Sequence, residues 1–555
     1  MVVSALDVVG IGLIGPYISM VVDPKMADSI FENFSQWIKI PSADDQRLRL
    51  MSYLLLCVFF IKTLSSIWVN YIIIKFSAKQ QARLRLELMH SYQYLPYTEF
   101  LQRNSSEYIY SIQTLSGQFA GGVVHIGLRA ISDGIVAIAI LILLAFTNIN
   151  AFLLLVGILV ASVFIYDKVF RNKIRSYGKR TNEASTLILR GVNEAIEGLK
   201  EIRILGRENY FYKQVKDNTK IFAIINTNYS VITTFARYLF ELIMVLFVVI
   251  LVLMTINQHQ DSTSILPTLG IFGIAAVRLL PAINVFTISI ATLRYNRDAV
   301  SRLYNDIIKL QLKPRVETKV VQNEHSVFKE LIIENVSFNY PTVNENAVAD
   351  VSLRILKGES IGIIGPSGSG KTTLLNLLLG LLKPNYGEIW LNEKPLNYSL
   401  DEWYSMVAYL PQQVFLLDDS LRRNVALGVD DKDINEGNLN QALRMARLND
   451  LVDKLSAGSE TILGENGVRL SGGQRQRVAL ARAFYHKRDV LVMDESTSAL
   501  DNKMEQEIVQ EIEQLKGNKT LIVVAHRLST VKNCDRIYRL ENGQIVDSGT
   551  PEEIL

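Results

Sequence analysis

Long apolar runs alternate with charged, helix-patterned stretches over the first 300 residues of the chain. A helix needs about 20 mostly apolar residues to cross a membrane. Six runs come close to that length, and the pattern predicts a membrane-spanning helix in each. Buried core helices of a large soluble protein are the alternative, which so little charge over such lengths disfavours. The six runs cover residues 2–22, 51–74, 130–146, 151–170, 233–254 and 265–293.

The connections between these runs differ in length and charge. Those after the second and fourth runs are long, helix-patterned and basic, as Lys79, Arg83, Arg175 and Lys179 illustrate. Basic residues beside membrane ends mark the cytoplasmic side. We therefore expect both long connections, the exit of the sixth run and the N-terminus on that side.

Two short stretches within these connections, 95–101 and 197–206, interrupt the helical pattern with proline or glycine around apolar residues. Such apolar faces suit docking into a groove of another domain. An ordinary helical turn at a loop tip explains the same pattern equally well.

One charge, Arg278, lies in the middle of the sixth apolar run. Ionised side chains inside a membrane are costly, and those that occur usually serve a function. We expect Arg278 to contact an anionic group of a substrate in a water-filled cavity. An intramembrane ion pair and snorkelling towards the membrane surface are the alternatives.

Beyond Arg294 the pattern turns polar and then changes its period. Residues 301–330 are rich in charge and contain Pro314, which is typical of a linker. From residue 331 onward short strand patterns alternate with helical ones, which predicts an α/β domain with much parallel sheet. The expected organisation is an all-α membrane domain of six helices over 1–300, a linker over 301–330 and an α/β domain over 331–555.

A glycine-rich stretch, Gly365-Pro-Ser-Gly-Ser-Gly-Lys371-Thr372, follows the apolar strand pattern 360–364 and precedes a helical pattern. This is the context of a phosphate-binding P-loop, in which backbone N–H groups and a helix N-terminus bind phosphate oxygens. The lysine of that motif reaches the β- and γ-phosphates, and the next hydroxyl binds Mg²⁺. A chance glycine-rich turn is the alternative. The candidate nucleotide-binding residues are Gly365, Ser367, Gly368, Gly370, Lys371, Thr372 and Thr373.

Three further residues follow strand patterns of the second half. Tyr340 ends the pattern 332–340, where an aromatic ring is able to stack on adenine. Gln412 follows a strand and is expected to reach Mg²⁺ or water, and His526 follows the strand pattern 521–525, a suitable place for contact with a γ-phosphate. Each has a purely structural alternative, which would be preferred if the P-loop were absent.

Two other motifs are more specific. Ser471 is a good N-cap, so that Leu470-Ser-Gly-Gly-Gln474 predicts a second anion-binding helix end with Ser471, Gly473 and Gln474. The apolar strand pattern 490–494 ends in two carboxylates. Asp494 is expected to hold hydrated Mg²⁺, and Glu495 to orient or deprotonate a water. Asp501 follows shortly afterwards.

The composition agrees with a protein that lies partly in a membrane. Of the 555 residues, 49% are hydrophobic and 20% are charged, which is too apolar for a soluble multidomain enzyme. The net charge of +3 is close to neutral for this size and gives no support to nucleic acid as a partner.

Taken together and in this order, the motifs resemble those of the ATP-binding cassette family. Residues 365–372 are similar to its Walker A motif, 470–474 to its signature and 461–467 to its X-loop. The remaining matches are Tyr340 to the A-loop aromatic, Gln412 to the Q-loop, Asp494 to Walker B, Glu495 to the catalytic glutamate and His526 to the switch histidine. The resemblance implies that ATP and Mg²⁺ are bound, that Glu495, His526 and Gln412 are catalytic, and that Asp501 belongs to the nucleotide site.

Six spans before one cassette resemble an exporter-type half-transporter. In that family two cassettes sandwich two ATP molecules, and each site pairs the Walker A of one subunit with the signature of the other. A chain with one cassette must then dimerise. Because both halves of the site match, the resemblance implies a homodimer with two competent sites, and a degenerate heterodimer is the alternative. The stretches 95–101 and 197–206 fall where the family has its coupling helices.

For the substrate, the chain resembles the bacterial flippases of lipid-linked oligosaccharides that serve protein N-glycosylation, over 7–16, 278–284 and 409–413. This implies alternating-access transfer of an amphipathic, anionic lipid-linked glycan to the outer leaflet of the inner (plasma) membrane, with Arg278 near its diphosphate. That family usually has a cytoplasmic helix before its first span, whereas Met1 here begins inside the span. The alternatives are a lipid, drug or peptide exporter, a nucleotide-gated channel or regulator, and a soluble DNA-repair or translation ATPase, which the six spans disfavour.

Overall fold

A computed structural model describes most of the chain. It covers residues 44–147, 149–257, 262–311, 327–341, 343, 345–464, 467–494, 516–525 and 528–555, together with residues 6, 9, 10, 12, 13 and 17. Contacts divide the chain into two units. Unit 1 comprises Met1–Leu95 and Gln102–Arg315, and unit 2 comprises Pro96–Leu101 and Val316–Leu555.

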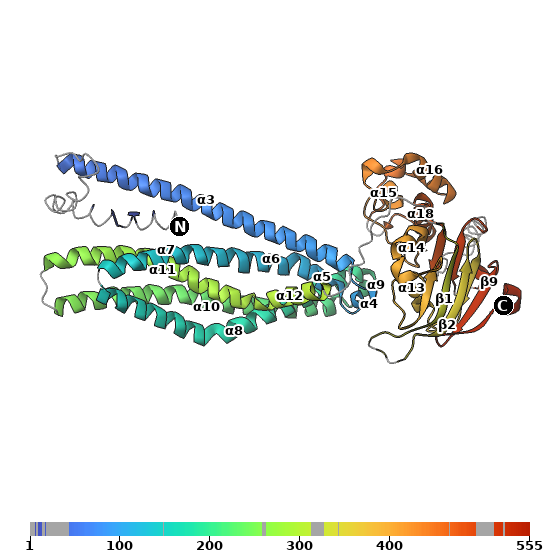
Figure 1. The fold of residues 1–555 in the computed structure, drawn as a ribbon, viewed down its shortest axis with the longest axis horizontal. Helices are drawn as coiled ribbons and strands as arrows, with labels where there is room; N and C mark the ends of the chain where they lie inside the picture. Colours follow the sequence, from blue (N-terminus) through green and yellow to red (C-terminus); the bar gives the residue numbers. More distant parts are fainter. Residues whose placement is uncertain are drawn as a thin grey trace. The chain divides into compact units, whose positions relative to one another are not determined.

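Unit 1 is built from long helices (Figure 1). Helix α7 lies beside α11, α8 lies beside α10, and α11 also contacts α8 and α10. Two π-helical turns, Ser111–Leu115 and Ala120–His125, join α5, α6 and α7 into one continuous helical path. The helices are α3 (Asp44–Gln93), α5 (Ser105–Tyr110), α6 (Ser116–Phe119), α7 (Ile126–Thr147), α8 (Ile149–Glu197), α9 (Leu199–Ile204), α10 (Glu208–Asn257), α11 (Ser262–Tyr295) and α12 (Arg297–Gln311).

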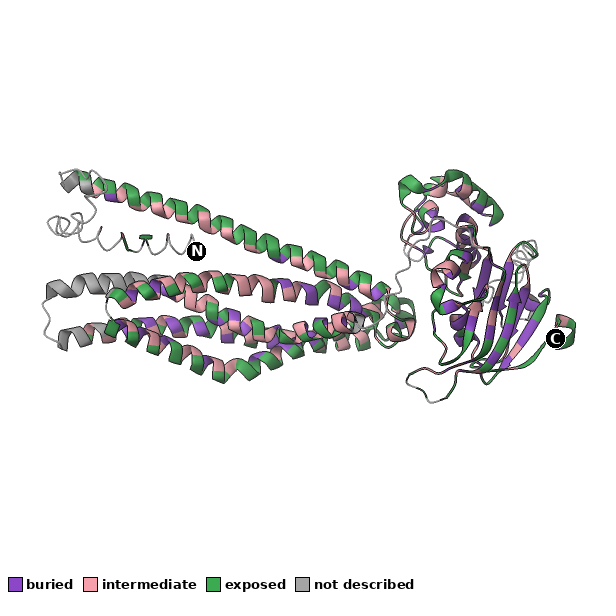
Figure 2. Ribbon diagram, in the orientation of Figure 1, coloured by how far each residue is buried: buried purple, intermediate pink, exposed green. Residues whose placement is uncertain are grey.

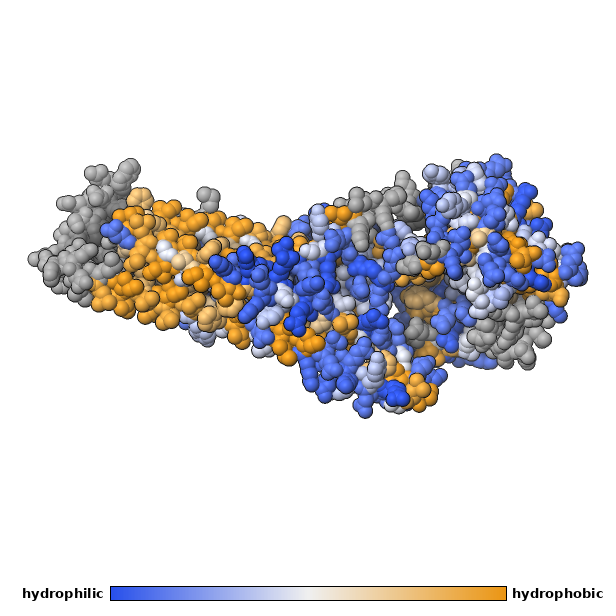
Figure 3. Space-filling model, turned by 90° about the horizontal axis from the view of Figure 1, so that it is seen from below, coloured by the Kyte–Doolittle hydropathy of each residue, from blue (hydrophilic) through white to orange (hydrophobic). Residues whose placement is uncertain are grey.

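Four helical segments of the described chain are long and apolar enough to cross a membrane: Leu48–Gln93, Ser105–Phe146, Ile149–Glu197 and Glu208–Ile250. They contain the second to fourth apolar runs of the sequence and residues 233–250 of the fifth. The first run lies almost wholly outside the described residues. Of the sixth run, the described side chains begin at Leu279, and Leu279–Tyr295 is a shorter apolar helix. On the face shown in Figure 3, hydrophobic side chains cover one end of this helical unit and hydrophilic side chains the other.

The interior of the bundle is apolar where α7, α8, α10 and α11 meet. Ile140, Leu155, Phe247 and Leu279 are buried together in one cluster. Helix α3 differs, because most of its surface is exposed (Figure 2) and large apolar side chains such as Trp68 lie on that surface. Exposed apolar surface of this extent is typical of a face covered by lipid or by a partner.

Helices α8 and α11 approach each other closely where α11 ends. A Cβ atom on Gly178 would lie 1.8 Å from the backbone oxygen of Tyr295. The Tyr295 hydroxyl donates a hydrogen bond to Thr181 Oγ1 (2.9 Å), and its ring stacks on Tyr229 with centroids 4.1 Å apart. Glycine at position 178 is therefore required for this backbone contact.

Unit 2 holds two sheets. Strands β2, β1, β4 and β5 form an antiparallel sheet in that order, and the six-stranded sheet has the order β10-β9-β3-β8-β7-β6. In the larger sheet only the β9–β10 pair is antiparallel. The strands are β1 (Glu330–Phe338), β2 (Val348–Leu356), β3 (Ser360–Ile364), β4 (Tyr386–Leu391), β5 (Lys394–Pro395), β6 (Val407–Leu410), β7 (Val490–Asp494), β8 (Thr520–Val524), β9 (Arg536–Glu541) and β10 (Gln544–Gly549).

Short helices complete unit 2 (Figure 1). They are α4 (Tyr97–Phe100), α13 (Lys371–Leu378), α14 (Leu400–Met406), α15 (Leu421–Val425), α16 (Glu436–Met445), α17 (Asn449–Lys454), α18 (Gly472–Tyr485), α20 (Leu528–Val531) and α21 (Pro551–Ile554). The expectation of an α/β domain with much parallel sheet is confirmed. Two strand boundaries shift: β1 begins and ends two residues before the predicted 332–340, and β8 lies one residue before the predicted 521–525.

Strand β7 is buried on both faces. Side chains along a strand alternate between its faces, and Val490 and Val492 of β7 lie in the apolar cluster that contains α13 and the antiparallel sheet. Leu491 and Met493 lie in the second cluster, with α16 and α18. Burial on both faces explains why β7 is continuously apolar in sequence.

Of the predicted docking stretch 95–101, residues Pro96–Leu101 group with unit 2. Its helix α4 follows Pro96, and Tyr97 packs against the apolar cluster between the two sheets. The second such stretch forms α9, in which Ile202 is buried whereas Ile204 and the following Leu205 are at least 70% exposed in this single chain.

Gly178→Ala tests the close contact of α8 with α11. The added methyl group meets backbone rather than a movable side chain, and overpacking of this kind costs about 1–3 kcal/mol. We expect a lower melting temperature for the purified full-length protein. Gly157→Ala is the matched control, because it lies on the same helix and a Cβ atom there meets nothing within 4 Å. Equal melting temperatures for the two variants would contradict the contact.

Candidate nucleotide-binding site

The loop between β3 and α13 is shaped by its glycines. Gly365 and Gly370 have φ angles of 154° and 99°. A Cβ atom on Gly365 would lie 2.1 Å from the Leu540 carbonyl oxygen, and one on Gly370 would lie 2.3 Å from that of Ala347. Neither position accepts a side chain, so the loop backbone packs directly on neighbouring backbone.

The predicted phosphate-binding lysine lies inside this loop. Lys371 is 6% exposed, and its Nζ donates hydrogen bonds to the carbonyl oxygens of Gly365 (3.0 Å) and Pro366 (2.8 Å). The nearby Ser369 hydroxyl is buried and has no hydrogen-bond partner among the described residues. A held cation, an unsatisfied buried hydroxyl and the N-terminus of α13 fit a phosphate group. The candidates Ser367, Gly368 and Thr372 are exposed.

Tyr340 lies beside the start of α13. It follows the end of β1, is half-buried, and its hydroxyl lies 3.3 Å from Thr373 Oγ1. The Tyr340 ring also meets Phe338 edge-on, with centroids 5.1 Å apart. Two of the sequence candidates, Tyr340 and Thr373, are thus in contact next to the phosphate loop.

The topology brings further candidates to one edge of the sheet. Strands β6, β7, β8 and β3 are parallel neighbours, so their carboxyl ends meet at the same edge. Asp494 ends β7, Gln412 follows β6 and is exposed, and the phosphate loop follows β3. Glu495, Asp501 and His526 lie outside the described residues, as does the side chain of Arg278 on α11.

A contact that the sequence did not predict holds Asp494. The Tyr409 hydroxyl donates a hydrogen bond to Asp494 Oδ2 at 3.1 Å. Burial and the neighbouring Asp494 charge raise the pKa of Tyr409, so the phenol keeps its proton and remains a donor at neutral pH. The only hint of this hydrogen bond in the sequence was a tyrosine on the strand that ends before Gln412.

The predicted signature stretch forms an ordered helix end. Ser471 is the N-cap of α18: its Oγ accepts from Gln474 N (3.3 Å), and Ser471 N donates to Gln474 Oε1 (2.8 Å). This reciprocal capping box fixes both side chains. Gly473 is buried between them. The expected N-cap role of Ser471 is confirmed.

Arg482 fixes α18 to the segment that follows Gln412. Its guanidinium donates to the carbonyl oxygens of Asn424 (2.6 Å) and Phe415 (2.7 Å) and to Asn424 Oδ1 (3.1 Å). Within the described residues no carboxylate pairs with Arg482, and burial lowers the pKa of this arginine to about 10. The fully buried Asn424 in turn binds the backbone of Leu417 through both ends of its amide. The sequence patterns did not predict these hydrogen bonds.

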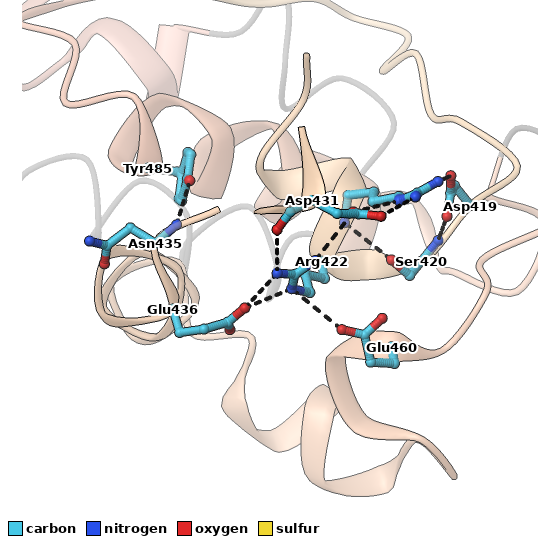
Figure 4. Close-up of polar contacts among 9 residues, drawn as sticks. Asp419, Ser420, Arg422, Asp431, Asn435, Glu436, Glu460 and Tyr485 are labelled. Atoms are coloured by element: carbon cyan, nitrogen blue, oxygen red, sulfur yellow. Dashed lines mark hydrogen bonds and ion pairs between the residues drawn. The ribbon is translucent and has the colours of Figure 1, made fainter. Parts of the chain in front are cut away.

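Ion pairs hold the neighbouring helical part together (Figure 4). Arg422 pairs with Asp431, Glu436 and Glu460, and Arg423 pairs with Asp419 and Asp431. Leu463 N donates to the Asp419 carbonyl oxygen (3.0 Å), which ties the predicted X-loop 461–467 to the same network. Glu465 and Asn466 of that loop lie outside the described residues.

Comparison with known proteins agrees with this geometry. Residues 348–498 match the model of the ABC transporter family, and residues 9–274 match that of the ABC transporter transmembrane region. The ATP-dependent lipid A-core flippase of Ralstonia nicotianae is 30% identical over 500 residues, which cover 88% of this chain and 82% of the relative. The chain belongs to the ABC transporter family.

Other similarities extend over the same length. The ATP-dependent lipid A-core flippase of Cupriavidus metallidurans is 29% identical over 514 residues, covering 90% of this chain and 84% of the relative. The fold is that of a bacterial Atm1-family ABC exporter solved with ATP bound, with a TM-score of 0.78, 19% identity and coverage of 98% of this chain and 96% of that one. This ABC transporter is therefore a multi-pass membrane protein that binds ATP and couples its hydrolysis to export.

Tyr409→Phe tests the hydrogen bond to Asp494. Loss of a partner that orients a metal-binding carboxylate typically costs 10–100-fold in metal affinity or activity. We expect half-maximal ATPase activity to require about tenfold more Mg²⁺. Tyr398→Phe is the control, because Tyr398 is 90% exposed. An unchanged Mg²⁺ dependence in Tyr409→Phe would show that Asp494 does not need this donor.

Proposed function

We propose that this transporter is a homodimeric, ATP-driven flippase of the inner (plasma) membrane that moves an anionic, glycan-bearing lipid from the cytoplasmic to the outer leaflet. The observation that carries the proposal is an ordered phosphate loop in the same chain as four described membrane-length helices. A lipid-linked oligosaccharide is the candidate from the sequence. Lipid A-core is a second candidate, supported by relatives named as its flippases. Arg278 stays a predicted contact for the substrate.

In this proposal, residues of the chain itself have the following roles at the nucleotide site. Lys371 offsets negative charge on the phosphates, and the loop N–H groups orient them. Thr372, Gln412 and Asp494 would hold Mg²⁺, which supplies further charge stabilisation when bound. Glu495 orients and deprotonates the attacking water, and His526 binds the phosphate that is released. Tyr340 stacks on the base.

A second copy of the chain completes the site. Ser471 and Gln474 of the partner would contact the phosphates held by the loop of the first copy. The apolar end of α9, with exposed Ile204 and Leu205, supports the same arrangement, because a partner groove would cover it. The nucleotide site would fit a drug or peptide exporter or a nucleotide-gated channel equally well. The relatives named as lipid flippases favour the lipid.

Reconstitution into liposomes tests the substrate. We expect ATP-dependent movement of a fluorescent lipid-linked oligosaccharide or of lipid A-core between leaflets, and none of phosphatidylcholine. Glu495→Gln should still bind ATP while its turnover falls at least 10²-fold, since general-base catalysis contributes 10²–10⁴. Ion conductance without lipid movement would favour a channel, and wild-type turnover of Glu495→Gln would remove Glu495 from its role.

Mixed dimers test the composite site. Lys371→Ala and Ser471→Arg each disable both sites of a homodimer. A dimer with one copy of each variant has one doubly altered site and one intact site, because the loop and the signature of each site come from different copies. We expect the co-expressed variants to recover ATPase activity that neither has alone. No recovery in isolated mixed dimers would mean that each chain completes its own site.

A further inference from the structure

A small recess between α8 and α11 of unit 1 combines charged, polar and apolar side chains. Its charged lining consists of Asp167 and Arg171 on α8 and Arg294 on α11. Tyr166, Phe170 and Ile290 are among its apolar lining residues. With its ion pair closed, the recess holds about one water-sized group.

One polar atom in the recess is unsatisfied. Thr287 is 2% exposed, and its Oγ1 has no hydrogen-bond partner among the described residues. Hydroxyl groups in helices normally donate to the carbonyl four residues earlier. On the same helix, Ser289 donates to the Val285 carbonyl and Thr292 to that of Ile288. The free hydroxyl of Thr287 is therefore a local exception that points into the recess lining.

The charges of the recess favour an anion. Arg294 Nη2 contacts both carboxylate oxygens of Asp167, at 2.7 and 2.9 Å. Arg171 lies one helical turn after Asp167 and has no ion pair within the described part of the chain. The lining thus carries two guanidinium groups and one carboxylate. An anion in the recess would meet a net positive charge, from two arginines and one aspartate, and the unpaired hydroxyl of Thr287 as a hydrogen-bond donor.

The recess lies where the apolar parts of both helices end. The apolar run of α8 covers 151–170 and that of α11 ends at residue 293, after which basic residues follow. Such basic ends mark the cytoplasmic boundary of the hydrocarbon layer. A lipid in the cytoplasmic leaflet would present its phosphate at this depth and its acyl chains to the apolar lining.

We propose that this recess binds the phosphate group of an anionic lipid before translocation. Arg171 and Arg294 bind the phosphate, Thr287 donates a hydrogen bond to it, and the Asp167 carboxylate gives up Arg294 as the phosphate enters. The inference rests on the proposed flippase function and names where its substrate is first held. Asp167 then competes with the phosphate for Arg294. Removal of the Asp167 charge should therefore tighten binding, whereas removal of Arg171 or of the Thr287 hydroxyl should weaken it.

The test measures binding of dioctanoyl phosphatidic acid to the purified full-length protein in detergent. Thr287→Val and Arg171→Gln should each weaken binding about tenfold, the usual effect of losing a hydrogen bond to a charged group. Asp167→Asn should tighten binding. It should still fold, because about a third of each side chain of the Asp167–Arg294 pair remains in contact with solvent, and ion pairs that are open to solvent contribute little to stability. Ser289→Ala is the matched control and should change nothing, since its hydroxyl is already bonded within the helix.

The ligand arms separate a lipid from a free anion. Dioctanoyl phosphatidylcholine should bind at least tenfold more weakly than phosphatidic acid, and so should inorganic phosphate, which lacks the acyl chains. Equal binding of inorganic phosphate would overturn the lipid assignment. Unchanged binding in Thr287→Val and Arg171→Gln, or weakened binding in Asp167→Asn, would overturn the site. If these results coincide with ATP-dependent lipid movement in liposomes, the inference fails while the proposed function stands.

Discussion

The parallel pairing of β6, β7, β8 and β3 is the constraint on which the nucleotide site depends. Strands β3, β7 and β8 are packed on both faces, so most of their side chains are committed to the core and their ends are left for chemistry. Pairing of Leu410 with Met493 and of Asp494 with Val524 brings residues far apart in the sequence to one edge. The phosphate loop follows β3 at that edge, so the fold places this loop and the Asp494 carboxylate at the same edge of the sheet.

The signature helix is ordered by its own chain. Ser471 and Gln474 cap each other, and Arg482 anchors the same helix to the backbone around Asn424. The Arg482 guanidinium donates to the backbone carbonyl oxygens of Asn424 and Phe415. Backbone acceptors have no side-chain rotamers, so their positions are fixed by the fold. Arg482 therefore ties α18 to the segment after Gln412.

Regular sequence patterns predicted the elements that are determined by neighbouring residues in the chain. The sequence marked β3 and β7 at their observed ends, because a strand buried on both faces is continuously apolar. It misplaced β1 by two residues, since that boundary is set by pairing with β2 and not by composition. Arg482 and Tyr409 were missed because their partners lie 58 and 85 residues away in the chain. The role of Gly178 was missed because a close approach between two backbones produces no periodic pattern of hydrophobic residues in the sequence.

The two proposed anion sites of this chain have one physical feature in common. Lys371 is held by the carbonyl oxygens of its own loop, and Arg294 by the carboxylate of Asp167. Each cation is already partly desolvated and oriented before a ligand arrives, so less water has to be removed and less side-chain entropy is lost on binding. An internal partner of this kind would also set a threshold, because a phosphate competes for the cation more strongly than a neutral group does. We infer that selectivity for phosphate follows from this competition, at the nucleotide site and at the α8–α11 recess alike.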